Sequence, residues 1–140
     1  MFNDGPFSTP RKADVAHWTS ALDQPTIHSV WTSLLAGLDD YSTDARGDVG
    51  SWIRIACLGG LQTLLEVGRR SSPETTAGVS LDQGTFDAIC RGMLKQMAER
   101  IDSVRRQAVC AVAYVARTFN DENKAPCIRQ PKLLQDLFST

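Results

Sequence analysis

Apolar side chains recur along the middle of the chain with the spacing of one helical face. The clearest run extends from about Asp48 to Val67, where apolar positions follow one another at intervals of three and four residues. This pattern predicts an amphipathic helix that Asp48 caps and Gly68 ends. The predicted core positions are Val49, Trp52, Ile53, Ala56, Cys57, Gly60, Leu61, Leu64 and Leu65. The predicted solvent-facing positions are Ser51, Arg54, Gln62, Thr63 and Glu66.

Three further runs have helical spacing. Pro25 and Thr26 open a shorter helix that ends before Asp39-Asp40, and this helix should form a hairpin with the 48–67 helix. A second hairpin is predicted from apolar stripes over residues 86–101 and 104–119. The candidate caps of its helices are Asp82 or Thr85 and Asp102 or Ser103. Because no stretch alternates apolar and polar residues over six positions, the sequence predicts an all-α fold.

The predicted organisation has three parts. Residues 1–24 form an N-terminal arm with room for one helix, over 11–22. Residues 25–120 form the two hairpins, separated by a loop at 69–80 that is rich in serine, threonine, glycine and proline. Residues 121–140 form a C-terminal tail, in which a short helix at 132–138 should dock on the bundle.

The two hairpins share a short pattern at corresponding places. It consists of an acidic residue in the turn, then an aliphatic residue followed by arginine, then a small residue three positions later. Its members are Asp48, Ile53-Arg54 and Cys57 in the first hairpin, and Glu99, Val104-Arg105 and Ala108 in the second. The pattern is typical of HEAT repeats, in which the arginine reaches the turn acid of its own or a neighbouring repeat. We therefore expect HEAT/armadillo-like helical hairpins, a fragment of an α-α superhelix; the alternative is a bundle of unrelated helices.

Charge and hydropathy argue against nucleic acids and membranes as partners. The 140 residues carry 15 basic and 16 acidic side chains, so the chain lacks the excess positive charge of a nucleic-acid-binding domain. No apolar run approaches the roughly 20 residues that cross a bilayer. The N-terminus lacks the basic and apolar segments of a secretory signal. We expect a cytoplasmic protein without a nucleic-acid or membrane partner.

No group of residues indicates catalysis, a metal or a cofactor. The four cysteines lie far apart without a CxxC pair, and His17 and His28 lack the HExxH spacing of zinc enzymes. No GxSxG segment accompanies the serines, histidines and aspartates. The sequence therefore predicts a protein that acts by binding rather than an enzyme.

Three segments resemble one family. Residues 40–54, DYSTDARGDVGSWIR, resemble a signature in the C-terminal part of tubulin-specific chaperone D, also called tubulin-folding cofactor D. Residues 98–105, AERIDSVR, are similar to a helix boundary of that family, and residues 133–138, LLQDLF, to its leucine-rich tail segment. The resemblance extends from about Val30 to Phe138.

This resemblance implies a piece of a much larger HEAT-repeat protein. With cofactors E and C and a small Arf-like GTPase, cofactor D assembles and dismantles α/β-tubulin heterodimers, and it holds β-tubulin. The assembled complex stimulates GTP hydrolysis by tubulin, whereas cofactor D itself is not known as a catalyst. We therefore expect part of a chaperone that binds β-tubulin, other cofactors, or both.

The connection within the first hairpin is the predicted partner-binding site, because a charged loop with a particular conformation suits recognition. The candidate residues are Tyr41, Asp44, Arg46, Gly47, Asp48 and Arg54. A structural role is the alternative, in which Asp44 and Arg46 pair with Arg54 and the helix ends to lock the turn. The alternative function is a generic helical-repeat adaptor that binds a non-tubulin partner through a groove around Met93 and Met97.

Overall fold

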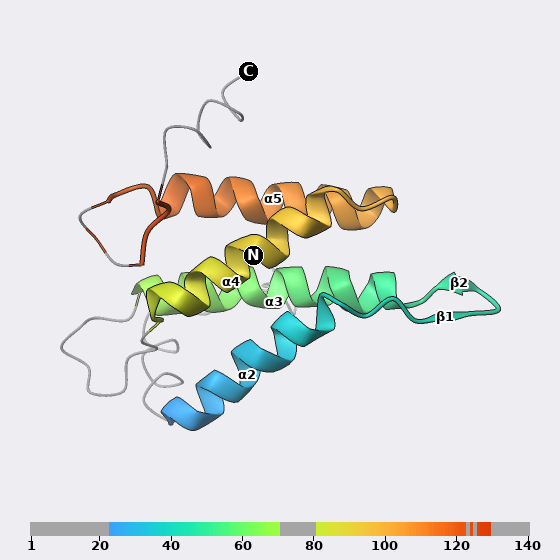
Figure 1. The fold of residues 1–140 in the computed structure, drawn as a ribbon, viewed down its shortest axis with the longest axis horizontal. Helices are drawn as coiled ribbons and strands as arrows, with labels where there is room; N and C mark the ends of the chain where they lie inside the picture. The colour runs from blue at the N-terminus through green and yellow to red at the C-terminus, as the bar shows by residue number, and fades with distance from the viewer. Residues whose placement is uncertain (1–22, 71–80, 123, 125, 130–140) are drawn as a thin grey trace, which may run out of the picture.

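Four helices form two stacked hairpins in the computed structural model, which describes residues 23–70, 81–122, 124 and 126–129. In the first hairpin α2 (Gln24–Gly37) packs against α3 (Gly50–Arg70), and in the second α4 (Gln83–Met97) packs against α5 (Asp102–Thr118). The hairpins stack mainly through α3 and α5, with a smaller contact between α2 and α4 (Figure 1). This arrangement confirms the prediction of an all-α, HEAT-like fold.

Aspartate side chains fix the start of three helices. Asp23 starts α2 and Asp82 starts α4, and each accepts a hydrogen bond at 3.0 Å from the backbone amide three residues later. Asp48 accepts the corresponding bond at 2.9 Å at the start of α3. Each carboxylate thus satisfies an amide that the first helical turn leaves unpaired. The predicted caps Asp48 and Asp82 are confirmed.

α3 is longer at its C-terminal end than the sequence predicts. It continues through Gly68 to Arg70 instead of ending at the glycine. Leu65 is 1% exposed in the core, and the Tyr114 hydroxyl of α5 donates a hydrogen bond to Glu66. These contacts hold the last turns of α3 on α5, and they outweigh the weak helix propensity of glycine.

α5 lacks the side-chain cap that the sequence predicts. Its N-cap is Ile101, without a side-chain hydrogen bond, and Asp102 and Ser103 lie inside the helix. Asp102 instead pairs with Arg105 at 2.5 Å and with Arg106 at 3.0 Å. The carboxylate still lies at the positive end of the helix dipole, but its partners are side chains of the next turn.

The core lies between the two hairpins, and the face of α3 that enters it is the predicted one only in part. The predicted core residues Cys57, Leu61 and Leu65 are buried. Leu58, which was not among them, is 0% exposed, whereas Trp52 is 61% and Ile53 43% exposed. Arg54, which the sequence analysis placed in solvent, is 0% exposed. The prediction for Trp52, Ile53 and Arg54 is wrong because α3 carries apolar residues on two of its sides, and helical periodicity alone does not say which side is buried.

The second hairpin supplies the other half of the core. The rings of Phe86 and Phe119 lie 5.1 Å apart between centroids. Met93 is 0% exposed, and Met97 is half-buried against the same cluster. The groove that the adaptor alternative expects around Met93 and Met97 is therefore filled with core side chains, and that expectation is wrong. The fully buried apolar residues of this hairpin also include Ile89, Val104, Ala108 and Ala111.

The described part of the tail lies against the second hairpin. Ile128 is 8% exposed, and its amide donates to the Phe119 carbonyl at 2.9 Å. The side chain of Gln83 pairs with the Cys127 backbone in both directions, at 2.9 and 3.1 Å. This pairing satisfies the polar groups of an extended segment that has no strand partner.

Three predicted features fall wholly or mostly outside the described residues: the arm helix at 11–22, the loop at 69–80 and the tail helix at 132–138. Of the loop, Arg69 and Arg70 are described, and they are the last residues of α3.

The burial of one face of α3 predicts that two side-chain truncations of similar size destabilise the fold by different amounts. Leu58→Ala should lower the free energy of unfolding by about 2–5 kcal/mol, because it leaves a cavity in the core. Ile53→Ala should cost less than about 1 kcal/mol, because that side chain is largely exposed. Urea denaturation followed by circular dichroism measures both values, and equal losses would contradict the burial of Leu58 over Ile53.

Candidate functional site

The connection between α2 and α3 forms a small β-hairpin that extends beyond the ends of the helices (Figure 1). Its strands, β1 (Thr43–Asp44) and β2 (Gly47–Asp48), pair antiparallel with Asp44 opposite Gly47. The sequence analysis did not predict them, because two-residue strands leave no alternation pattern. Gly47 has a φ of 111°, a conformation that glycine adopts without strain and other residues rarely adopt. The turn is therefore specified by its glycine.

Asp44 and Arg46 order the tip of this hairpin. One carboxylate oxygen of Asp44 accepts from the Arg46 backbone amide at 2.7 Å, and the other accepts from Nε and Nη2 of Arg46 at 2.9 and 2.7 Å. The Arg46 guanidinium, as donor to this carboxylate, holds the pKa of Asp44 below its ordinary value of 3.8. The same guanidinium lies 5.4 Å from the centroid of the Trp52 ring. The Arg46 side chain is 69% exposed, so the tip is ordered by its own contacts while it faces solvent.

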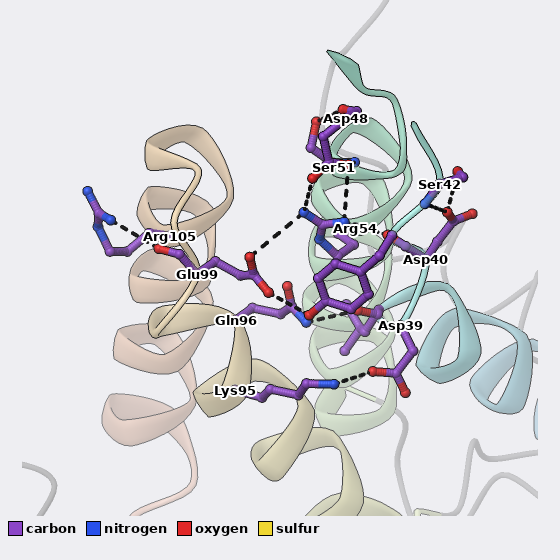
Figure 2. Close-up of polar contacts among 12 residues, drawn as sticks. Asp39, Asp40, Ser42, Asp48, Ser51, Arg54, Lys95, Gln96, Glu99 and Arg105 are labelled. Carbon is purple, nitrogen blue, oxygen red and sulfur yellow. Dashed lines mark hydrogen bonds and ion pairs between the residues drawn. The ribbon is translucent and has the colours of Figure 1, made fainter. Parts of the chain in front are cut away.

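Behind the tip, Arg54 lies at the centre of a second group of contacts (Figure 2). Its Nη1 donates to the Asp40 carbonyl oxygen at 2.5 Å, and its Nη2 donates to Asp48 Oδ2 at 3.0 Å. Nη2 also lies 3.9 Å from Oε2 of Glu99, in the turn between α4 and α5. The buried positive charge is thus balanced by one carboxylate from each hairpin. We call Asp40, Tyr41, Asp48, Arg54 and Glu99 the junction.

Tyr41 covers the junction and joins its two sides. Its ring centroid lies 4.3 Å from Cζ of Arg54, and its hydroxyl donates to Oε1 of Glu99 at 2.5 Å. The guanidinium therefore meets a π face on one side and carboxylates on the others, which shields a charge that water does not reach.

Two further contacts link the connection to the last turn of α4. Lys95 Nζ lies 2.6 Å from Oδ1 of Asp39. Gln96 is 0% exposed, and its Nε2 donates to the Leu38 carbonyl at 2.8 Å. Leu38 is the C-cap of α2, whose last carbonyls lack helical partners, so Gln96 satisfies one of them.

The carboxylates of the connection are held in their ionised form. The hydrogen bond from Arg54 is the main reason that the pKa of Asp48 lies below its ordinary value of 3.8. The pKa of Asp40 is lowered chiefly because the Ser42 hydroxyl donates to its side chain. Asp48 also caps α3 through the Ser51 amide. The connection therefore depends on negative charge at both aspartates.

The six predicted site residues divide between these two places. The tip holds Asp44, Arg46 and Gly47, and the junction holds Tyr41, Asp48 and Arg54. The structural alternative expects Asp44 and Arg46 to pair with Arg54, and the structure has other pairs. Arg54 pairs with Asp48, while Asp44 and Arg46 pair with each other.

Sequence reasoning found some members of the junction and missed others. It predicted that the arginine of a hairpin reaches the turn acid of its own or a neighbouring repeat, and Arg54 reaches both Asp48 and Glu99. It missed Asp40, which contributes a backbone carbonyl and so leaves no signal in its side chain. It also missed Gln96, whose burial follows from the stacking of the two hairpins.

The counterpart of Arg54 in the second hairpin has a different environment. Arg105 is exposed, and its Nη1 donates to the Glu99 carbonyl at 3.0 Å. In α5 the preceding Val104 is 0% exposed, whereas in α3 the preceding Ile53 is exposed and the arginine is buried. The aliphatic-arginine pair therefore faces the core differently in the two helices. In α5 the aliphatic residue is buried, and in α3 the arginine is buried.

Neither a metal site nor a membrane-spanning helix is found in the described ranges. Among these residues, no three or more His, Cys, Asp and Glu side chains come together as a metal ion would require. None of the described helices is long and apolar enough to cross a membrane.

A family model described as tubulin folding cofactor D C terminal matches residues 87–140. This match confirms the resemblance to tubulin-folding cofactor D. The cofactor D match covers most of α4, all of α5 and the tail, and the junction residue Glu99 lies within it. The signature at 40–54 precedes the matched residues, and its resemblance to cofactor D stays a prediction. No solved structure gives a significant match to the chain.

Removal of the positive charge of Arg54 should destabilise the fold strongly. Arg54→Met should lower the free energy of unfolding by about 3–5 kcal/mol, because it leaves Asp48 and Glu99 in the junction without their cation. Urea denaturation at neutral pH measures this loss.

Arg105→Met is the matched control, because Arg105 occupies the same place in the repeat pattern but is exposed. It should cost less than about 1 kcal/mol, as exposed ion pairs do. Equal losses for Arg54→Met and Arg105→Met would contradict a special role of the buried arginine.

The lowered pKa of Asp48 predicts how its contribution depends on pH. A carboxylate whose pKa is lower in the folded chain stabilises the fold above its unfolded value of 3.8, and this stabilisation is lost as the pH falls through the folded pKa. Asp48→Asn keeps an N-cap but removes the charge. The variant should therefore be less stable than the parent chain at pH 7, and the gap should be smaller at a pH below 3.8, where the carboxylate becomes protonated. A gap that is equal at both pH values would contradict the ion pair with Arg54.

Proposed function

We propose that the chain is part of a tubulin-folding cofactor and that the tip of its β-hairpin, from Asp44 to Gly47, binds β-tubulin or another cofactor. Binding would take place while α/β-tubulin heterodimers are assembled and dismantled. The family match over residues 87–140 supports the tubulin-folding role. The resemblance of residues 40–54 to the family signature supports the choice of the connection as the binding element.

The observation that carries this proposal is an exposed tip that is already ordered. Arg46 is 69% exposed, yet its backbone and guanidinium are both held by Asp44. A side chain that is ordered before binding loses little conformational entropy when a partner arrives. Arginine is also enriched among the residues that dominate binding energy. The tip therefore offers a charged group in a fixed position.

The junction residues act on binding from behind the tip. Arg54 is 0% exposed, so a partner does not reach it. Asp48 joins the end of β2 to Arg54 and to the first turn of α3. These two residues therefore position the hairpin, whereas Tyr41, at 45% exposed, is open to direct contact.

The partners follow from the family resemblance. β-Tubulin is the first candidate, and cofactors C and E and a small Arf-like GTPase are the others. In this proposal the chain acts in the cytoplasm by binding. The GTP hydrolysis of tubulin in the assembled complex then needs no catalytic residue from this chain.

Arg46→Ala tests the tip directly. The substitution should weaken binding to β-tubulin or α/β-tubulin by about 2 kcal/mol, roughly thirtyfold in Kd, as expected of an arginine that dominates an interface. The free energy of unfolding should change by less than about 1 kcal/mol, because the ion pair with Asp44 is exposed. Biolayer interferometry measures the Kd, and circular dichroism measures the fold.

Arg106→Ala is the matched control, because Arg106 is an exposed arginine of α5 in an ion pair with Asp102. Binding should be unchanged in this variant. Equal binding by the parent chain and Arg46→Ala would remove the tip from the interface. If the folded parent chain binds neither form of tubulin, the same pair of variants should be assayed against cofactors C and E and the GTPase, and binding to none of them would contradict the proposal.

A further inference from the structure

The second helical hairpin holds the connection just before its first strand. Three side chains do this, two from the last turn of α4 and one from the turn that follows, and Figure 2 shows them pointing toward the connection: Lys95, Gln96 and Glu99. Their hydrogen bonds to residues 38–41 measure 2.6, 2.8 and 2.5 Å. Strand β1 begins at Thr43, so it starts two residues after a segment that the second hairpin fixes.

The second strand of the β-hairpin is held by α3 instead. Asp48, the last residue of β2, accepts from the Ser51 amide at 2.9 Å and from Nη2 of Arg54 at 3.0 Å. One strand therefore follows a segment fixed to α4, and the other leads into α3. The direction of the β-hairpin depends on how the two helical hairpins lie relative to each other.

The bond between Tyr41 and Glu99 is the one of the three that lies nearest to β1. The Tyr41 ring packs on the Arg54 guanidinium, so a phenylalanine would keep that contact and lose only the hydroxyl. The Glu99 side chain is 16% exposed, which leaves a partner little of it to touch. An effect of Glu99 on partner binding would therefore pass through Tyr41 and Arg54.

We propose that Glu99 is a positioning residue for partner binding, and that it sets the direction of the tip through the hydroxyl of Tyr41. This inference rests on the proposed function of the tip, and it adds that binding by the first helical hairpin depends on the second. A tip that points in one direction loses less conformational freedom on binding than a tip that points in many. The bond between Tyr41 and Glu99 thus adds affinity without contact between Glu99 and the partner.

The direction of the tip can be measured in the free chain. Residual dipolar couplings report how the amide bonds of the tip are oriented relative to those of α3. Tyr41→Phe should change the tip couplings together and leave those of α3 as they are. Tyr114→Phe is the matched control, because the Tyr114 hydroxyl also donates to a glutamate of the other hairpin, Glu66, near the far end of α3. The control should leave the tip couplings unchanged.

Partner binding should follow the direction of the tip. Tyr41→Phe should weaken binding to β-tubulin or α/β-tubulin roughly tenfold in Kd, as expected for the loss of one hydrogen bond to a charged group. Tyr114→Phe should bind like the parent chain. Biolayer interferometry measures the Kd, and melting followed by circular dichroism verifies that both variants are folded.

A double-mutant cycle separates positioning from direct contact between the Tyr41 hydroxyl and the partner. Glu99→Leu should weaken binding about as much as Tyr41→Phe, and the double variant should be no weaker than either, because both substitutions remove the same bond. Glu99→Gln keeps an acceptor for the hydroxyl and should restore most of the affinity. Additive losses, or full binding by Glu99→Leu, would assign Tyr41 to direct contact and overturn the role of Glu99.

The measurements on the free chain keep this inference separate from the proposed function. Unchanged tip couplings in Tyr41→Phe would overturn the positioning role, whatever the chain binds. Changed couplings with unchanged affinity would overturn the link between direction and binding. A folded parent chain that binds neither tubulin nor the other cofactors would contradict the proposed function, and with it the role of Glu99 in binding, while the couplings would still decide whether Glu99 directs the tip.

Discussion

A guanidinium removed from solvent needs partners for its charge and its N–H groups, and the partners of Arg54 set the arrangement of both hairpins. They come from three separate places, which are the Asp40 carbonyl, the Asp48 carboxylate and Glu99 in the α4–α5 turn. The path of the connection, the first turn of α3 and the stacking of the second hairpin therefore meet at one side chain. Displacing any of these segments would leave a buried charge less well balanced, which costs several kcal/mol.

The need to reach Arg54 also explains a glycine at the start of α3. A Cβ at Gly50 would lie 2.4 Å from the Asp40 carbonyl oxygen, which is far too close for any side chain. The connection thus passes directly over the first turn of α3, and the Gly50 amide donates to the Ser42 carbonyl at 2.9 Å. This close approach brings the Asp40 carbonyl within reach of the guanidinium. A backbone contact and a buried charge therefore require the same glycine.

The sequence predicted the parts of this structure that depend on near neighbours. The hairpins and the caps Asp48 and Asp82 follow from helical spacing and from short-range hydrogen bonds. The orientation of α3 does not follow in this way. The predicted stripe joins Leu61 with Trp52 and Ile53. The buried face joins Leu61 with Leu58 and Arg54 instead, and a charged residue on that face argues for the predicted one.

What decides between these two sides lies far along the chain. The carboxylate of Glu99 lies near Arg54 and also accepts a hydrogen bond from the hydroxyl of Tyr41. Tyr41 lies 58 positions before Glu99 in the sequence. Local periodicity carries no information about contacts of this range. For the same reason the repeat pattern identified the correct acids and arginines but did not reveal that Arg54 is buried and Arg105 exposed.

The difference in range also separates the tip from the junction in the proposed function. Asp44 and Arg46 are two residues apart, so the tip is ordered by contacts within itself. The direction in which the tip extends depends instead on the junction, whose contacts join the two hairpins. A partner that touches only the tip depends on the contacts within the tip. A partner that touches the tip and the helices together depends on the contacts of the junction as well. In the proposed function, the exposed charged residues between Asp40 and Arg54 give the tip a fixed shape, and the buried ones give it a fixed direction.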